Sequence, residues 1–178
     1  MDRIPTPAVE SATGETAEVY ERLKESIGSI PNAFAAIGAH GPAALKVVLD
    51  AESVLASSGL DKADLETIKL VASMSSGCLY CVAAHTELGK MAGLDEATLR
   101  RLHNGERTGS TKRDALANLV RGLTMTTGTI SDVIFAMVKA VGYTDAQLVY
   151  ISLAVALTSF TNVFNRINDT ALDIAVSV

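Results

Sequence analysis

Residues 60–93 have the sequence LDKADLETIKLVASMSSGCLYCVAAHTELGKMAG, and this stretch decides the fold class. The Ser-Ser-Gly of residues 75–77 separates two segments of helical character. Asp61 is placed to cap a helix that runs to Met74, because an aspartate side chain can accept the free N–H groups of a first turn. A second helix is expected over residues 78–91. The stretch therefore predicts two consecutive helices joined by a tight turn.

The rest of the chain continues this pattern of helices separated by glycine, proline and capping residues. The expected helices are residues 14–27, 31–37, 42–58, 61–74, 78–91, 94–104, 111–127, 131–142 and 144–165. Hydrophobic residues make up 48% of the chain, aromatic residues are few and Trp is absent, which favours helices over strands. Thr144 and Gln147 have the spacing of a capping box at the start of the last helix. With no linker or repeat, we expect one all-α helical bundle domain over residues 1–178.

Charge and cysteine content indicate where the protein works. The net charge is −5 and the isoelectric point about 5.2, so no nucleic-acid-binding surface is expected. The first residues, Met1 to Pro5, lack a basic stretch followed by an apolar run, so no secretion signal is expected. Two cysteines three positions apart cannot form the disulfide framework of a small secreted protein. These features predict a cytoplasmic protein.

Residues 146–165 form an uncharged, largely apolar run. The run is long enough to span a bilayer. Polar side chains such as Gln147 and Asn162 interrupt it, and no Lys/Arg cluster flanks it to set an orientation. We therefore expect no membrane span, and instead a helix buried in the core or in an interface between subunits.

Cys78 and Cys81 are the only cysteines in the chain, and His85 follows four residues after the second. At about 100° per residue on one helix, the three side chains share a face. His85 then lies roughly 6 Å along the axis from Cys81 and about 10.5 Å from Cys78. Because thiolate is the reactive form of cysteine, we expect His85 to activate Cys81 and Cys78 to close a disulfide with it. The alternative nucleophile is Cys78, which the helix dipole favours, as in thioredoxin-type helices.

Glu66 lies on the preceding helix and shares a face with Leu70. A carboxylate at this position could hold His85 in a useful tautomer. Lys62 and Lys69 are four and three positions away, so an ordinary surface ion pair is the alternative interpretation.

Glu66, eleven further residues, Cys78-x-x-Cys81, three more residues and His85 together resemble the active-site motif of the alkylhydroperoxidase D-like group. This group belongs to the carboxymuconolactone decarboxylase superfamily. The resemblance implies a proton relay in which Glu66 acts on His85, and His85 acts on Cys81 as the peroxidatic thiol. Cys78 would be the proton donor and resolving partner.

The resemblance extends beyond this motif. Its core spans residues 60–93, and the sequence NVFNR at residues 162–166 resembles the end of members called peroxidase-related. The founding alkylhydroperoxidases carry a histidine just before the second cysteine, where this chain has Tyr80, which donates a hydrogen bond but does not titrate near neutrality. Tyr80 and Asn162 are candidate supporting residues, although Asn162 and Asn165 could simply satisfy backbone or interface groups.

The family also implies properties of the whole protein. These are an all-helical subunit assembled as a trimer or hexamer, and reduction by an external dithiol protein or lipoyl-type carrier. No metal, haem or other bound cofactor is implied. Lactone decarboxylation is not expected, because the decarboxylase branch lacks the dithiol.

The sequence thus predicts a thiol peroxidase or disulfide reductase acting on hydrogen or organic peroxides. The alternative is a non-catalytic protein that uses the same dithiol to sense redox state or to bind metal. A zinc site could combine both cysteines, His85 and Glu66, but the separation of Cys78 from His85 on a straight helix fits tetrahedral ligation poorly.

Overall fold

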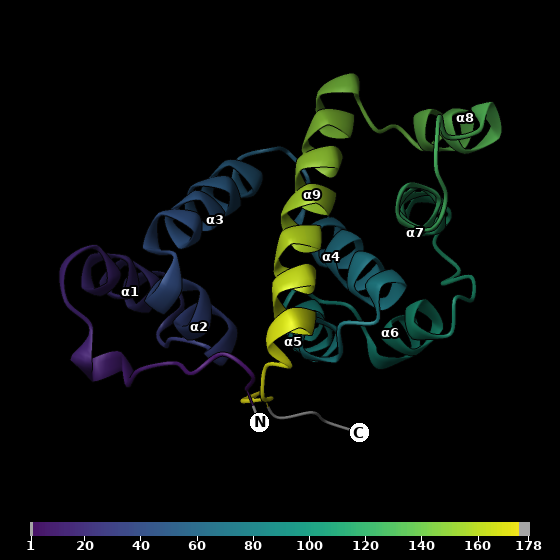
Figure 1. The fold of residues 1–178 in the computed structure, drawn as a ribbon. Helices are drawn as coiled ribbons and strands as arrows, with labels where there is room; N and C mark the ends of the chain where they lie inside the picture. The colour runs from purple at the N-terminus through teal and green to yellow at the C-terminus, as the bar shows by residue number, and fades with distance from the viewer. Residues whose placement is uncertain (1, 175–178) are drawn as a thin grey trace.

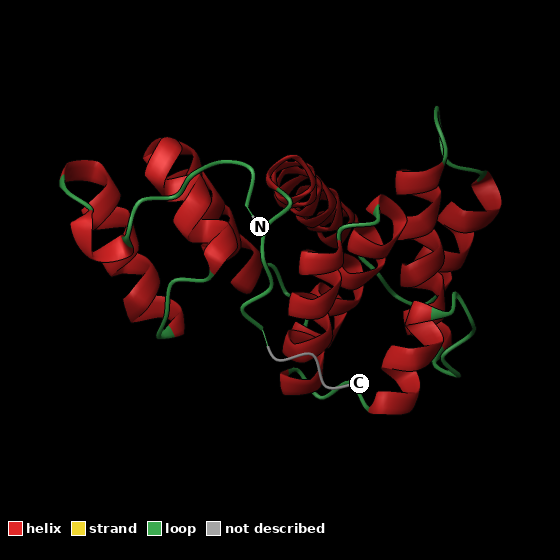
Figure 2. Ribbon diagram, turned by 60° about the horizontal axis from the view of Figure 1, so that its bottom comes forward, coloured by secondary structure: helices red, strands yellow, loops and turns green. Residues whose placement is uncertain are grey.

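The computed structural model describes residues 2–174 (Figure 1). The helices are α1 (Gly14–Ile27), α2 (Asn32–His40), α3 (Pro42–Ala56), α4 (Lys62–Ser76), α5 (Leu79–Met91), α6 (Glu96–His103), α7 (Thr111–Met125), α8 (Asp132–Ala140) and α9 (Asp145–Asn168). A short 3-10 turn, η1 (Val9–Ser11), precedes them, and no strand occurs within residues 2–174 (Figure 2). The predicted all-α fold is confirmed.

The long helix α9 runs through the middle of the molecule and separates two groups of helices (Figure 1). α1, α2 and α3 pack together on one side, and α4 to α8 lie on the other. α4 is the central scaffold, because it packs against α5, α7 and α9 and buries Ile68, Leu70 and Val71. The two ends of the described chain also lie together, where the N–H of Arg3 donates to the carbonyl of Asn168.

Capping residues set the helix boundaries next to the two cysteines. Asp61 accepts the N–H of Asp64 and starts α4, as predicted. Gly77 ends α4 with a φ of 70°, a left-handed conformation that glycine adopts without steric cost. Cys78 follows in an extended conformation as the N-cap of α5. The sequence analysis placed Cys78 inside the helix, and the structure corrects this, because α5 begins at Leu79.

The capping box predicted at Thr144 and Gln147 is present at the start of α9. The N–H of Gln147 donates to the Thr144 hydroxyl, and the Gln147 side chain accepts the N–H of Thr144. α9 continues past its predicted end to Asn168 and stops at Asp169, which has a left-handed φ of 54°. The additional turn places Asn168 and its neighbours next to the N-terminal segment.

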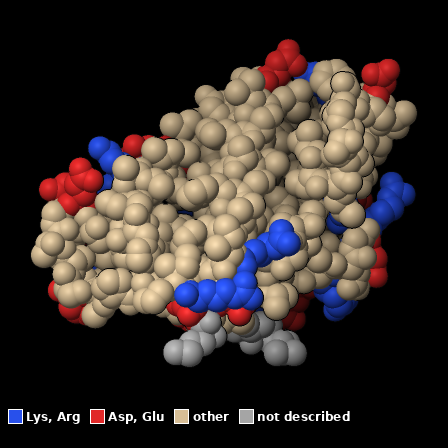
Figure 3. All heavy atoms as spheres, in the orientation of Figure 1, with Lys and Arg blue, Asp and Glu red and all other residues tan. Residues whose placement is uncertain are grey.

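The sequence predicted that this helix is buried in the core or in an interface between subunits. Within the single chain, much of the apolar surface of α9 is exposed. Only 28% of its most apolar 18-residue window is buried. Val149, Val163 and Ile167 are more than half exposed, and the face in Figure 3 that lies over α9 is largely uncharged. Within residues 2–174, α9 is the one helix whose length and composition would allow it to cross a membrane, a test that an apolar core helix also passes.

Candidate active site

The dithiol lies where α5 meets α4 and α9. Cys78 and Cys81 are free thiols, only 2% and 3% exposed, and their Sγ atoms are 2.6 Å apart. The backbone N–H of Cys81 donates to Cys78 Sγ at 3.3 Å, so the Cys78 sulfur acts as the cap of α5. A sulfur in this position receives a first-turn N–H and lies at the positive end of the helix dipole.

The pKa values of the two thiols shift in opposite directions. The hydrogen bond with the Cys81 thiol lowers the pKa of Cys78 most strongly. Burial opposes this effect, but backbone N–H groups and the charge of Arg166 assist it, and the pKa of Cys78 falls to about 7. The same contact with Cys78, together with burial, raises the pKa of Cys81 far above its ordinary value. The first thiolate of the pair is therefore Cys78, and the Cys81 thiol donates to it.

The shifts and the position of Cys78 at the cap of α5 favour the alternative nucleophile, Cys78, over Cys81. The choice of Cys81 assumed that Cys78 lies inside the helix, whereas Cys78 is the cap of α5. It also relied on contact between His85 and Cys81, and within residues 2–174 no hydrogen bond joins them. His85 is instead held by the carboxylate of Glu66.

Glu66 and His85 meet between α4 and α5. Glu66 Oε2 lies 2.9 Å from His85 Nδ1, and the two side chains are only 12% and 14% exposed. Burial opposes ionisation of Glu66, but the hydrogen bond and charge of His85, with the charge of Lys69, hold its pKa below the ordinary value. The buried position argues against the surface ion pair. Lys69 Nζ is 3.8 Å from Glu66 and makes two shorter contacts, 2.7 and 2.8 Å, with Glu52 of α3.

A small apolar cluster encloses the dithiol. Both cysteines pack with Ala33 of α2 and with Tyr80, and Ile174 of the C-terminal segment packs against them. The sulfurs are therefore covered from the side of the C-terminal segment, and a substrate needs local opening to reach them.

Tyr80 joins the C-terminal segment to this cluster. Its hydroxyl donates to Asp173 Oδ1 at 2.8 Å and accepts the N–H of Ala33 at 3.4 Å. Burial and the hydrogen bond to Asp173 raise the pKa of Tyr80 above its ordinary value, so it stays protonated. Asp173 also accepts the N–H of Asn32 at 2.7 Å. Tyr80 thus lies beside the sulfurs and anchors the segment that covers them.

The two asparagines of α9 have different partners. Asn162 Oδ1 accepts the hydroxyl of Ser73 at 3.0 Å, while its Nδ2 is buried without a hydrogen-bond partner within the described residues. Asn165 Nδ2 lies 3.3 Å from Cys81 Sγ, and this is the contact that the sequence analysis did not assign. A signal existed: the buried polar residues of α9 fall at residues 158, 162, 165 and 168, a spacing that places them on one helix face.

Comparison with known proteins shows what this chain is similar to. Residues 42–108 match the carboxymuconolactone decarboxylase family. The structure is similar to a protein of unknown function from Agrobacterium tumefaciens, suggested to be the antioxidant defence protein AhpD. The two chains are 25% identical, with a TM-score of 0.69, over 76% of this chain and 94% of that one. The fold is thus that of alkylhydroperoxidase-like proteins, and residues 42–108 are similar to the carboxymuconolactone decarboxylase family.

Two further structures show how widely this alkylhydroperoxidase-like fold is used. An alkylhydroperoxidase AhpD core protein from Ralstonia eutropha JMP134, described as an uncharacterized peroxidase-related protein, has a TM-score of 0.84. It is 18% identical over 97% of this chain and 92% of that one. The debrominase Bmp8 has a TM-score of 0.79 and is 14% identical over 96% of this chain and 92% of its own. Comparison with curated protein sequences gives no match. These similarities suggest a peroxidase-related enzyme, and the fold alone does not fix its substrate.

No group of three or more His, Cys, Asp or Glu side chains within residues 2–174 is placed to hold a metal ion.

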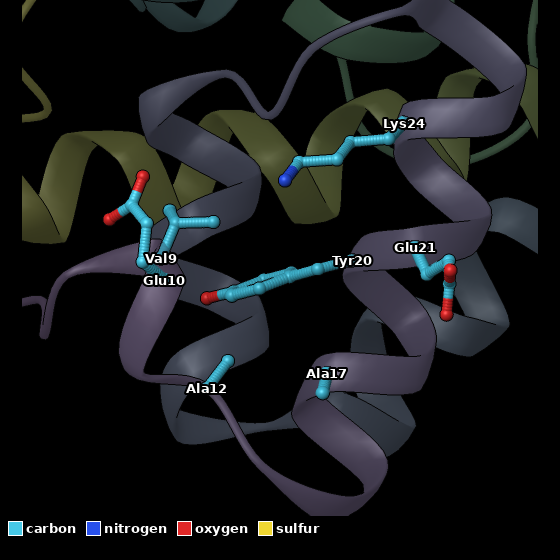
Figure 4. A pocket seen from close by; sticks show the side chains of 7 residues that line it. All are labelled: Val9, Glu10, Ala12, Ala17, Tyr20, Glu21 and Lys24. Atoms are coloured by element: carbon cyan, nitrogen blue, oxygen red, sulfur yellow. The ribbon is translucent and has the colours of Figure 1, made fainter.

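A pocket of about 240 Å³ opens between η1 and α1, with the ring of Tyr20 extending across it (Figure 4). It is lined by Val9, Glu10, Ala12, Ala17, Tyr20, Glu21 and Lys24. None of the dithiol residues lines this pocket, so it is separate from the candidate active site.

Proposed function

We propose that this chain is a thiol-dependent peroxidase that reduces hydrogen peroxide or an organic hydroperoxide with Cys78 and Cys81. The observation that carries the proposal is the 2.6 Å contact between two free sulfurs, one of which is an acidic thiol at a helix N-cap. A thiol with a pKa of about 7 is roughly half ionised at neutral pH, whereas an ordinary cysteine is only a few per cent ionised. The similarity of residues 42–108 to the carboxymuconolactone decarboxylase family, and of the fold to alkylhydroperoxidase-like proteins, supports the same chemistry.

In the first step, the Cys78 thiolate attacks the terminal oxygen of the peroxide. The O–O bond breaks, Cys78 becomes a sulfenic acid, and the electron pair leaves with the second oxygen. The Cys81 thiol, 2.6 Å from the Cys78 sulfur, gives its proton to that oxygen. The products of this step are an alcohol, or water from hydrogen peroxide, and a Cys81 thiolate.

In the second step, the Cys81 thiolate attacks the sulfur of the Cys78 sulfenic acid. An S–S bond forms and the hydroxide that leaves takes up a proton delivered through His85 and becomes water. Glu66 directs Nδ1–H of His85 toward its carboxylate, so Nε2 is the nitrogen that exchanges the proton. Fast closure of the disulfide protects Cys78 from irreversible oxidation.

An external dithiol completes the cycle. One thiolate of a dithiol protein or lipoyl-type carrier attacks the disulfide, and its second thiol then releases both cysteines in reduced form. Two electrons pass from the carrier to the peroxide in each turnover. The proposal requires no bound cofactor or metal, because all the bonds that change lie in the peroxide and the sulfurs.

We also propose that the protein works in the cytoplasm as a homotrimer or homohexamer, without a membrane or nucleic-acid partner. The net charge of −5 and the exposed apolar face of α9 support these assignments. A reducing compartment would supply the dithiol carrier.

Intact mass and turnover together test the proposed function. One equivalent of peroxide should remove two hydrogens from the reduced chain, a loss of about two mass units, as the Cys78–Cys81 disulfide forms. With a dithiol donor in excess, peroxide should then disappear over many turnovers. The double variant C78S/C81S is the control and should consume none.

The same measurements distinguish the alternative function. A redox sensor would form the disulfide once and show no sustained peroxide consumption with any dithiol donor. A metal-binding protein would take up zinc and lose thiol reactivity. Either result would overturn the peroxidase proposal.

A further inference from the structure

Asn165 of α9 contacts one of the two reacting sulfurs. Its Nδ2 lies 3.3 Å from Cys81 Sγ, and both residues are less than 5% exposed. Within residues 2–174, the Asn165 amide is the one side-chain N–H group that donates to this sulfur. The proposed function assigns Asn165 no role.

A chain of hydrogen bonds fixes the direction in which the Asn165 amide points. The backbone N–H of Ile4 can only donate, and it donates to Asn168 Oδ1 at 2.9 Å. The NH₂ group of Asn168 therefore faces Thr170, and Nδ2 donates to Thr170 Oγ1 at 3.0 Å. The single proton of the Thr170 hydroxyl is then directed to Asn165 Oδ1, 2.8 Å away. The oxygen of Asn165 is thus occupied, and its NH₂ group must face Cys81.

This orientation matters because a thiolate at Cys81 would be buried. A buried charge is costly unless donors compensate it, and a hydrogen bond to the charged form favours that form. The charged and titratable groups that act on the two sulfurs are Cys78 and Cys81 on each other, Arg166, and Tyr80 with its partner Asp173. Arg166 acts on Cys78, and Tyr80 is committed to Asp173.

We propose that Asn165 is a catalytic residue whose amide NH₂ stabilises the thiolate that Cys81 becomes when it gives up its proton. Thr170 and Asn168 are positioning residues that hold this amide. The proposal rests on the proposed function, in which the Cys81 thiolate must attack the Cys78 sulfenic acid. Asn165 therefore supports the Cys81 thiolate from the proton transfer that forms it through closure of the disulfide.

Titration of Cys81 alone tests the proposal without any peroxide. The background is Cys78→Ser, which leaves one thiol whose ionisation is followed by thiolate absorbance. Adding Asn165→Asp replaces the donor with a carboxylate and should raise the pKa of Cys81 by about one unit or more. Thr170→Val removes the orienting hydroxyl and should raise it by less, whereas Thr170→Ser should restore the original value. Thr158→Val, an equally buried isosteric change on α9, is the control and should leave the titration unchanged.

The second readout follows the sulfenic acid in the full dithiol. After one equivalent of peroxide, Asn165→Asp should accumulate trappable sulfenic acid at Cys78 several-fold above the parent chain. An unchanged Cys81 titration in both Asn165→Asp and Thr170→Val, with normal helical content, would overturn the proposal. If Asn165→Asp does not fold, Thr170→Val and Thr170→Ser carry the test. A parent chain that ignores peroxide would refute the proposed function and leave the titration result standing.

Discussion

Nδ1 of His85 lies 2.9 Å from Oε2 of Glu66, and this contact joins α5 to α4 beside the dithiol. The carboxylate accepts the Nδ1 proton, so the imidazole has one defined tautomer. Lys69 adds positive charge on the other side of Glu66 and is itself bound to Glu52 at the end of this series of charges. Glu66 therefore stays ionised although it is buried, next to His85, through which the proton of the second step passes.

Glu66→Gln should slow closure of the disulfide without unfolding the protein. Gln keeps the shape of the side chain but removes the charge that holds His85, so delivery of the proton to the leaving hydroxide should be less efficient. After one equivalent of peroxide, we expect disulfide formation to be roughly threefold to tenfold slower and trappable sulfenic acid to last longer. An unchanged rate of closure would leave Glu66 with a purely structural role.

The same substitution should change how stability depends on pH. Burial raises the pKa of Glu66, but His85 and Lys69 lower it by more, so the folded pKa lies below the unfolded value. Stabilisation by the charged carboxylate is therefore present above the unfolded pKa and is lost as pH falls through the folded one. The free energy of unfolding of the parent chain should exceed that of Glu66→Gln by about 1–3 kcal/mol near neutrality. Denaturant titrations should show this difference shrinking in acid, and a difference that grows in acid would contradict the ion pair.

The single-cysteine variants should identify the attacking sulfur. The pKa shifts favour Cys78, so Cys81→Ser should form a trappable sulfenic acid at Cys78 and then stall. Cys78→Ser should react far more slowly with peroxide, because its remaining thiol is buried and does not lie at the cap of α5. Trapping followed by peptide mass spectrometry measures both. Sulfenic acid formed rapidly in Cys78→Ser but not in Cys81→Ser would restore the order that the sequence alone suggested.

The contact between Tyr80 and Asp173 should limit access to the dithiol. Asp173→Asn weakens the hydrogen bonds to Tyr80 and to the N–H of Asn32, which hold the C-terminal segment over the sulfurs. We expect alkylation of the native protein to accelerate several-fold, because local opening becomes less costly. Asp169→Asn is the matched control, since Asp169 is exposed and contacts only Arg3, at 4.0 Å. Equal rates in both variants would mean that another segment controls access.

The exposed apolar side chains of α9 predict a soluble assembly. Left uncovered in water, a surface of this kind favours aggregation, so a second copy is the expected partner. Light scattering without detergent should give a mass of several subunits, and Val163→Glu, on the exposed face, should lower it. A monodisperse monomer of 18.6 kDa would contradict the prediction, and a requirement for detergent would favour a membrane.

Local signals predicted most of the fold. Asp61, Gly77 and the Thr144 capping box each act within a few residues, and all three have the expected roles. The pairing of Glu66 with His85 was also predictable, because the motif fixed both positions on adjacent helices.

The parts that the sequence did not reveal depend on small shifts or on distant contacts. Cys78 lies one residue outside the helix, where its sulfur touches the Cys81 thiol and receives the N–H of Cys81, and both contacts lower its pKa. Asn165 reaches Cys81 across 84 positions of sequence, and Asp173 reaches Tyr80 across 93. Periodicity shows which face of a helix is buried, but it does not show which residue of another helix that face will meet.

Because Cys78 is the N-cap of α5, the stability of the fold is coupled to the redox equilibrium of the dithiol. In the reduced chain a thiolate terminates α5, whereas in the oxidised chain that negative charge is gone and the sulfur is bonded to Cys81. Any free energy by which the thiolate stabilises the reduced fold must appear again in the disulfide equilibrium, because the two processes close one thermodynamic cycle. A helix terminus that stabilises the thiolate therefore makes the disulfide a stronger oxidant, which a dithiol carrier reduces more readily.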